Sequence, residues 1–251
     1  GRGRGTALWN ADGVPVGPEY LADTDIAPGD EVARALKTER GDTGEVVLDV
    51  SDIAFESEFP DLAGKCRDHG VALPDIPVAP AEHFLCGGVD ADTAGRTSLD
   101  HLFAVGECAR TGVHGANRLA STSLLEGLVW GRRAGDAATG HAVEEIEAPD
   151  LLDRDPALPD NFAREKFHRL RRVMDEQVGI ERTPDGLGRS QAVLRRLKGE
   201  VDAYARTRTS RSLYELRSAA IVSLLIARAA SENGESVGCH YLTGPDAPAA
   251  D

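Results

Sequence analysis

The residues of this sequence that could do chemistry gather in one glycine-rich stretch, His83–Glu126. Near its end, Arg118 stands just before a run of hydroxyl side chains that indicates the start of a helix. The first turn of a helix has unpaired N–H groups and roughly half a positive charge. A guanidinium beside it adds a full charge in a geometry that suits carboxylates. The sequence therefore predicts a binding site for a carboxylate ligand around Arg118.

A second polar group, Glu107, follows a short apolar run. Leu102–Val105 predicts a buried strand, and Glu107 would lie at its carboxyl end, where open α/β sheets bind ligands. A carboxylate there can accept hydrogen bonds from sugar or ribityl hydroxyls. Taken singly, each residue also has a simpler interpretation: a solvated strand-end carboxylate for Glu107, a surface arginine for Arg118, and a hydrogen-bonded structural imidazole for His83 and His114.

The elements that must position these groups can be inferred from the same stretch. The segments HFLCGGVDAD and LFAVGE predict two strands, and the glycine-bearing loop TGVHGANRLAS follows them. Ser121–Ser123 would cap the next helix, LLEGLVWGRRAGDAA, whose packed face would consist of Leu124, Leu125, Leu128 and Val129. A strand, a glycine loop and a helix N-terminus in this order bind anions or dipolar rings.

The segment before this stretch mixes helix and strand. Glu31–Glu39 predicts a short helix ended by Gly41, Glu45–Val50 predicts a strand, and Asp52–Gly70 predicts a loop followed by a helix. Leu73–Pro80 holds three prolines and no helical period, which indicates a hinge or a domain crossover.

The segment after it is helical. Glu144–Pro159, with three prolines and an acidic excess, predicts a linker. Apolar spacing then predicts helices over Phe162–Val178, Gln191–Ala205 and Ser210–Ala230, which would pack as a small bundle. The Ala-Pro tail at Ala247–Ala250 is expected to fray.

The charge balance limits the partners. The 28 Lys and Arg residues stand against 42 Asp and Glu, a formal charge of −14, which argues against nucleic acid and anionic membranes because phosphates are held by clustered cations. Only Lys37, Lys65, Lys166 and Lys198 are lysines. An acid-rich, lysine-poor surface is typical of halophilic proteins, and a merely acidic cytosolic protein is the alternative.

Three further features of the sequence bear on metal binding, on the cellular compartment and on membrane insertion. Cys66, Cys86, Cys108 and Cys239 form no C-x-x-C pair and no metal-like spacing with the histidines, so we expect no metal site and reduced thiols in a cytoplasm. The longest uncharged, mostly apolar stretch, between Arg217 and Arg228, is too short to span a bilayer. The sequence begins without Met, which suggests a fragment.

The ordered string from His83 to Gly135 resembles the flavin-proximal block of the succinate dehydrogenase/fumarate reductase flavoprotein family. Ala120-Ser121 after Asn117-Arg118-Leu119, together with Glu126, resembles the L-aspartate oxidases, because the respiratory members usually carry Gly-Gly and Asp at those places. The segments Arg2–Gly5 and Ala27–Ala35 resemble parts of the family's capping domain, and MDEQVGIERT and RSLYELRSAA resemble parts of its C-terminal helical domain. The family's G-x-G-x-x-G fingerprint after a strand is not found here.

The resemblance implies an FAD enzyme with particular site residues. Glu107 would bind the ribityl region of FAD, and Ser123 with Leu124 would face the pyrimidine edge of the isoalloxazine ring. Gly87 and Gly88 would let the backbone approach that ring closely. His83 and Arg118 would clamp the carboxylates of the substrate and present its Cα hydride to the flavin.

The resemblance also implies the reaction and its setting. L-aspartate would be oxidised to iminoaspartate, with oxygen or fumarate as the electron acceptor. This reaction is the first step of NAD synthesis through quinolinate, which makes quinolinate synthase a candidate partner in the cytoplasm.

The implied architecture is α/β plus α. Residues 1–78 would be the C-terminal part of an α+β capping (substrate) domain, and residues 79–143 the C-terminal part of a Rossmann-like FAD-binding domain. A linker at 144–160 would lead to a three-helix bundle at 161–251.

Departures from the family pattern leave two alternatives open. The family's capping motif begins Arg-Asp, with a catalytic arginine, where this chain has Gly29-Asp30, and Arg34 matches only the second arginine of the motif. Glu235-Ser236-Val237-Gly238 replaces the family's E-S-R-G. The alternatives are the flavoprotein subunit of succinate dehydrogenase or fumarate reductase, and an inactive fragment of either enzyme.

Overall fold

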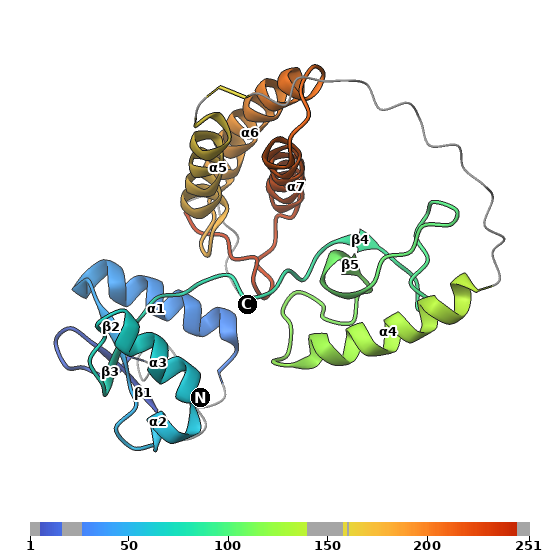
Figure 1. Cartoon of the computed structure of the whole chain (residues 1–251). Coiled ribbons are helices and arrows are strands. Elements are labelled where there is room, and N and C mark those ends of the chain that lie inside the picture. Colours follow the sequence, from blue (N-terminus) through green and yellow to red (C-terminus); the bar gives the residue numbers. More distant parts are fainter. Residues whose placement is uncertain (1–5, 17–26, 140–157, 160, 245–251) are drawn as a thin grey trace. The chain divides into compact units, whose positions relative to one another are not determined.

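The structure is a computed structural model that describes residues 6–16, 27–139, 158–159 and 161–244 (Figure 1). The chain divides into two compact units, Gly1–His83 and Phe84–Asp251. Both units contain helix and sheet, as the mixed architecture inferred from the sequence requires. The predictions for Arg2–Gly5, for most of the linker Glu144–Pro159 and for the tail Ala247–Ala250 fall outside the described residues.

The first unit packs helices on a small antiparallel sheet. The strands β1 (Ala7–Asn10), β2 (Val46–Asp49) and β3 (Asp75–Val78) lie in the order β1-β2-β3. The helices are α1 (Gly29–Thr43), α2 (Phe55–Glu58) and α3 (Pro60–Asp68). Val32 and Leu36, one turn apart on α1, pack with fully buried Val46 of β2.

Two predictions for this unit were wrong. Leu73–Pro80 is not simply a hinge, because it contains β3, which pairs with β2. Proline is tolerated there because β3 is an edge strand of the described sheet, where a missing N–H removes no essential hydrogen bond. Gly41 does not end α1; the helix runs on to Gly44, whose φ of 88° ends it.

The second unit begins with a parallel pair of short strands beside a long helix. β4 (Val89–Asp90) pairs with β5 (Ala109–Arg110), and the 3-10 turn η2 (Gly106–Cys108) leads into β5. The helix α4 (Thr122–Ala138) contacts η2. The predicted strand at Leu102–Val105 does not form. Among the described residues this segment makes only one isolated bridge, between Phe103 and Arg96, because no neighbouring strand is available to pair with it.

The packed face predicted for α4 is also wrong. Four of its apolar side chains are exposed: Leu124 at 74%, Leu125 at 63%, Leu128 at 72% and Val129 at 42%. Only Glu126 and Ala134 of this helix are buried in the described structure. These side chains therefore lie on the surface of the described structure and not in its core.

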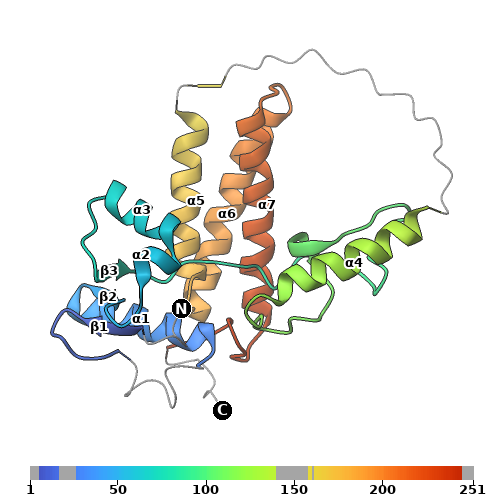
Figure 2. The ribbon, with the colours of Figure 1, turned by 60° about the horizontal axis from the view of Figure 1, so that its bottom comes forward.

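Three helices that pack side by side, followed by a short segment after the last of them, make up the rest of the described second unit (Figures 1 and 2). They are α5 (Phe162–Val178), α6 (Pro184–Ala205) and α7 (Arg211–Glu232). Thr183 and Ser210 cap α6 and α7 by accepting hydrogen bonds from Gly186 N and Leu213 N. α6 therefore begins seven residues before the predicted Gln191, at Pro184, which suits the first helical position.

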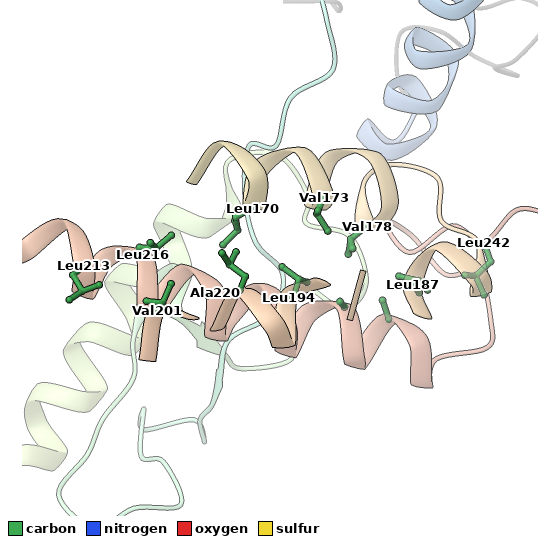
Figure 3. Packing of buried hydrophobic residues seen from close by; sticks show 13 residues of the cluster. Leu170, Val173, Val178, Leu187, Leu194, Val201, Leu213, Leu216, Ala220 and Leu242 are labelled. Carbon is green, nitrogen blue, oxygen red and sulfur yellow. The ribbon is translucent and has the colours of Figure 1, made fainter. Parts of the chain in front are cut away.

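Leucine, valine and alanine side chains from all three helices interlock in one core (Figure 3). Leu187, Leu194, Leu197, Leu213 and Leu216 are among the largest side chains that are almost completely buried. None of the described helices is long and apolar enough to cross a membrane. The four cysteines are free. Within the described ranges, no group of three or more His, Cys, Asp or Glu side chains could hold a metal ion.

Candidate functional site

Arg118 lies in the loop between β5 and α4, with its guanidinium over an aromatic ring. The Arg118 Cζ atom is 4.6 Å from the centroid of the Phe84 ring. Nη1 donates a weak hydrogen bond of 3.4 Å to the Leu119 carbonyl. Nε is buried and has no hydrogen-bond partner among the described residues. A buried donor without a partner is costly, so Arg118 can take an acceptor that the described residues do not supply.

The inner side of the same loop is fixed to α4 by a buried carboxylate. Glu126 is 4% exposed; its Oε1 accepts a hydrogen bond from the Thr111 hydroxyl, and its Oε2 lies 2.7 Å from His114 Nε2. The His114 ring stands edge-on to Phe84 at 5.2 Å between centroids. We call Thr111, His114 and Glu126 the Glu126 clamp.

Sequence reasoning treated His114 as a hydrogen-bonded structural imidazole and gave Glu126 and Phe84 no part in the site. One signal could have identified the clamp. A single carboxylate, Glu126, interrupts the apolar run from Leu124 to Val129, and a buried carboxylate needs hydrogen-bond donors nearby.

The N-terminus of α4 begins directly after this loop and has no side-chain cap. Ser121 is the N-cap residue with φ of 66°, and its hydroxyl makes no capping hydrogen bond in the described structure. The Thr122 hydroxyl turns back to the Leu119 carbonyl. The predicted capping by Ser121–Ser123 was therefore wrong: Ser121 has a left-handed backbone instead of the extended one usual at an N-cap. The Thr122 N–H donates to the Leu119 carbonyl at 3.2 Å. The next N–H groups of the first turn, those of half-buried Ser123 and exposed Leu124, remain available for an anionic or dipolar ligand.

Glu107, Gly87 and Gly88 come together around the β4–β5 pair. Exposed Glu107 lies in η2, and its Oε1 accepts a hydrogen bond of 3.1 Å from Leu85 N. Gly88 has φ of 153°, and a Cβ there would lie 2.4 Å from the Cys108 carbonyl oxygen. A Cβ on Gly87 would meet nothing within 4 Å. Gly88 is therefore required by the close approach of the chain's own backbone, whereas Gly87 borders open space.

The remaining predicted residues belong to the first unit. His83 is its last residue and is exposed. Gly29 is the first residue of α1, and a Cβ there would meet nothing within 4 Å. Arg34, a little over one turn later, pairs with Asp30 at 3.0 Å. The second unit thus brings Arg118, Ser123 and Leu124 into one loop-helix junction. His83 belongs to the first unit and is not part of this junction.

The chain is similar to a family of FAD-binding domains and to known L-aspartate oxidases. Residues 1–124 match the family described as "FAD binding domain". The chain is 68% identical over 243 residues to the L-aspartate oxidase of Halobacterium salinarum, a match that covers 96% of this chain and 48% of that protein. It is 39% identical over 262 residues to the L-aspartate oxidase of Pseudomonas aeruginosa, covering 98% of this chain and 48% of that protein. The chain therefore spans about half the length of the curated relatives it matches.

The fold comparison points the same way. The structure matches a quinol fumarate reductase from E. coli with a TM-score of 0.81 and 27% identity, over 100% of this chain and 51% of that one. This identity is far below that to the L-aspartate oxidases. A match of 68% over nearly the whole chain, together with the shared flavoprotein fold, shows that the chain belongs to the L-aspartate oxidase family.

Proposed function

We propose that this chain contributes the substrate-binding and flavin-facing residues of an FAD enzyme that oxidises L-aspartate to iminoaspartate. One observation supports this most directly. The buried, unpartnered Nε of Arg118 lies beside the uncapped N-terminus of α4. A fixed cation and a helix N-terminus together suit a ligand with negative charge at two nearby points, such as a dicarboxylate next to an electron-rich ring.

The residues around this junction fit FAD. Ser123 and Leu124 offer backbone N–H groups to the pyrimidine edge of the ring, and the exposed Leu124 side chain offers an apolar contact. Gly87 leaves room for the ring, and Glu107, held by Leu85 N, is available to a ribityl hydroxyl. FAD, when bound, would supply a two-electron acceptor for the substrate.

Arg118 and His83 are proposed to bind the substrate carboxylates. Phe84 supports the Arg118 guanidinium from one face, which limits its rotation and reduces the entropy lost on binding. In the reaction the Cα–H bond breaks and its hydride leaves with both electrons. The nitrogen lone pair then forms the C=N bond, and the nitrogen loses one proton. Oxygen or fumarate would take the two electrons away afterwards.

The proposal extends to the domains and the setting. Residues 1–78 would belong to the capping domain, 79–143 to the FAD-binding domain and 161–251 to a helical three-helix domain, with 144–160 as a linker. The product would enter NAD synthesis through quinolinate in the cytoplasm, with quinolinate synthase as the enzyme that consumes it.

The test is carried out on this chain joined to the part of the Halobacterium salinarum relative that it does not match; we call this the joined protein. Arg118→Ala should raise the KM for L-aspartate about tenfold or more, because a charged hydrogen bond to a carboxylate contributes about 1.5–3 kcal/mol. Arg118→Lys should recover part of the loss. Arg132→Ala, at an exposed position of α4, is the matched control and should leave KM unchanged.

The alternative function, a flavoprotein subunit of succinate dehydrogenase or fumarate reductase, rests on the fold match to fumarate reductase. The choice of substrate in the same kinetic assay distinguishes it from L-aspartate oxidation. A joined protein that reduces its flavin with succinate and not with L-aspartate would contradict the proposal. Unchanged aspartate kinetics in Arg118→Ala would remove Arg118 from the substrate site.

A further inference from the structure

The segment that follows α7 contacts the loop that carries Arg118. The Cys239 backbone N donates a hydrogen bond of 3.1 Å to the Ala116 carbonyl. The Cys239 thiol lies 3.4 Å from the Asn117 side-chain oxygen. Ala116 and Asn117 directly precede Arg118 in the chain. The two contacts therefore link the helical part of the second unit to the backbone that positions Arg118.

The contact is so close that it requires a glycine. Gly238 has φ of 53°, and a Cβ at this position would lie 2.6 Å from the Ala116 carbonyl oxygen and 2.8 Å from the carbonyl carbon. Any side chain at 238 would push the two backbones apart. Four residues earlier, Gly234 has open space where a Cβ would lie. The two glycines thus differ in the space beside them and in φ, which is positive at Gly238 and not at Gly234.

Arg182 and His240 attach this segment to the helices. Arg182, between α5 and α6, donates from Nη1 to His240 Nδ1 at 2.8 Å and from Nε to the carbonyls of Val178 and Gly179 at 3.1 Å each. A guanidinium can only donate, so Nδ1 is the acceptor and the neutral His240 carries its proton on Nε2. That nitrogen donates to the Asn233 carbonyl at 3.0 Å. Every polar atom of the imidazole is therefore used to hold the segment.

We propose that the segment Gly238–His240 positions Arg118 for substrate binding, with Arg182 as its anchor. The inference rests on the proposed function, which makes Arg118 a carboxylate ligand. The Glu126 clamp holds the inner side of the loop, and Gly238–His240 holds the backbone at Ala116 and Asn117. Neither group is proposed to contact the substrate. Holding the loop on both sides fixes the direction of the Arg118 side chain before a substrate arrives, which is how positioning residues increase affinity.

The test compares four variants of the joined protein. Gly238→Ala separates the two backbones, and Gly234→Ala is its matched control. His240→Ala removes both hydrogen bonds of the imidazole, whereas His240→Gln can still accept from Arg182 and donate to Asn233. The measurements are hydrogen exchange of the Cys239 amide, KM and kcat for L-aspartate, FAD content and the thermal midpoint of the helices.

In Gly238→Ala and His240→Ala we expect faster exchange of the Cys239 amide and a KM raised about tenfold, the scale of one charged hydrogen bond. FAD content should stay close to that of the unsubstituted protein in both variants, and the helix midpoint should do so in Gly238→Ala. Gly234→Ala and His240→Gln should behave like the unsubstituted protein. Rescue by Gln and a KM that changes without loss of FAD are results that a merely structural contact would not give.

Two results would overturn the inference. One is Cys239 exchange in Gly238→Ala that matches the Gly234→Ala control. The other is faster exchange with an unchanged KM, in a protein where Arg118→Ala does raise KM. If Arg118→Ala itself leaves KM unchanged, the proposed function of Arg118 has failed and the inference fails with it. The Arg118 control therefore tells the two failures apart.

Discussion

Glu126 Oε2 and His114 Nε2 lie 2.7 Å apart in the buried space between α4 and the loop that carries Arg118. A carboxylate only accepts hydrogen bonds, so His114 must carry its proton on Nε2, and Thr111 donates to the other oxygen. One carboxylate on α4 thus holds two points of the loop. This pair therefore attaches the loop that carries Arg118 to α4.

The Glu126 clamp should contribute measurably to stability. In Glu126→Leu the Thr111 hydroxyl and the His114 N–H lose their acceptor while still buried, which costs about 1–3 kcal/mol in the free energy of unfolding. Glu126→Gln keeps one acceptor and should cost less. Asp136→Leu, at an exposed position of the same helix, is the control. Urea unfolding followed by Trp130 fluorescence in a Trp9→Phe background measures the effect. Equal losses in Glu126→Leu and Asp136→Leu would refute the prediction.

The neighbouring glycines 87 and 88 should respond differently to alanine. Gly88→Ala places a Cβ 2.4 Å from the Cys108 carbonyl oxygen at a positive φ, so it should destabilise the β4–β5 pair by about 1–3 kcal/mol. Gly87→Ala meets nothing of the chain within 4 Å and should leave the free energy of unfolding nearly unchanged. If Gly87 faces the flavin, the same substitution should weaken FAD binding in the joined protein. Thermal unfolding and FAD titration test the pair of variants. Equal stability in both variants would contradict this interpretation.

The sequence predicted the helices best, because their apolar period and their caps are local. Phe162–Val178 has the predicted bounds, and Ser210 caps α7 as its position before an apolar run suggested. The α6 start was missed because Thr183-Pro184, a cap followed by a proline, precedes the first periodic apolar residues. The strand β3 was missed because prolines usually exclude strands, and only its edge position makes it acceptable.

The errors around the site have a different cause. Leu102–Val105 and the leucines of α4 have the composition of buried elements, but their burial depends on partners that the described chain does not provide. Ser121 looks like a cap, yet its positive φ prevents capping. The family resemblance pointed to Arg118 and Ser123 because it depends on the order of residues along the chain. It did not show the Glu126 clamp or the contact from Cys239, because both depend on how distant segments fold together.

The α5–α7 helices should become less stable as the pH is lowered through the range where histidine titrates. Burial lowers the pKa of His240 below its ordinary 6.5, and nearby Arg182 lowers it further. A lowered folded-state pKa means that the unfolded chain binds the proton more readily, so stability is full above pH 6.5 and is lost as the pH falls below it. The carboxyl groups of Glu200 and Asp202, whose pKa values are lowered by hydrogen bonds from lysine and arginine, titrate at lower pH.

The measurement is the thermal midpoint of the α5–α7 helices by circular dichroism between pH 7 and pH 5. His240→Gln should flatten the pH dependence, because Gln keeps the two hydrogen bonds without titrating. His168→Gln, at an exposed position of α5, should retain it. A pH dependence that is the same in both variants would rule out His240 as its source.

Salt should stabilise the first unit more than the second. Residues 1–83 carry 7 basic and 17 acidic side chains, a formal charge of −10, whereas residues 84–251 carry 21 and 25, a charge of −4. Repulsion between exposed like charges weakens as the Debye length falls to about 3 Å at 1 M salt. Trp9 reports on the first unit and Trp130 on the second, so Trp130→Phe and Trp9→Phe variants give separate melting midpoints. From low to molar KCl, the Trp9 midpoint should rise more. Equal shifts would contradict a halophilic first unit.

Gly29 occupies the place where the family motif is expected to carry a catalytic arginine, and the described residues leave space for a Cβ there. It is the first residue of α1, and a Cβ there would meet none of the described residues beyond its own helix within 4 Å. Replacing glycine gains up to about 1 kcal/mol of helix propensity, and a cation at a helix N-terminus loses about 0.3–1 kcal/mol. Stability should therefore change little. Arg34, the alternative group, already pairs with Asp30.

In the joined protein, Gly29→Arg should raise the rate of anaerobic flavin reduction by L-aspartate about 10²–10⁴-fold, the usual contribution of a general acid or base. The KM should change less than the rate, because Arg118 and His83 are proposed to bind the carboxylates in both forms. Gly41→Arg, which also adds an arginine to open space on α1, is the control and should give no gain. If the Gly29 protein already reduces its flavin as fast as Gly29→Arg does, the inactive-fragment alternative fails. Arg34→Lys would then show whether Arg34 supplies the missing group, by a loss of rate without loss of FAD.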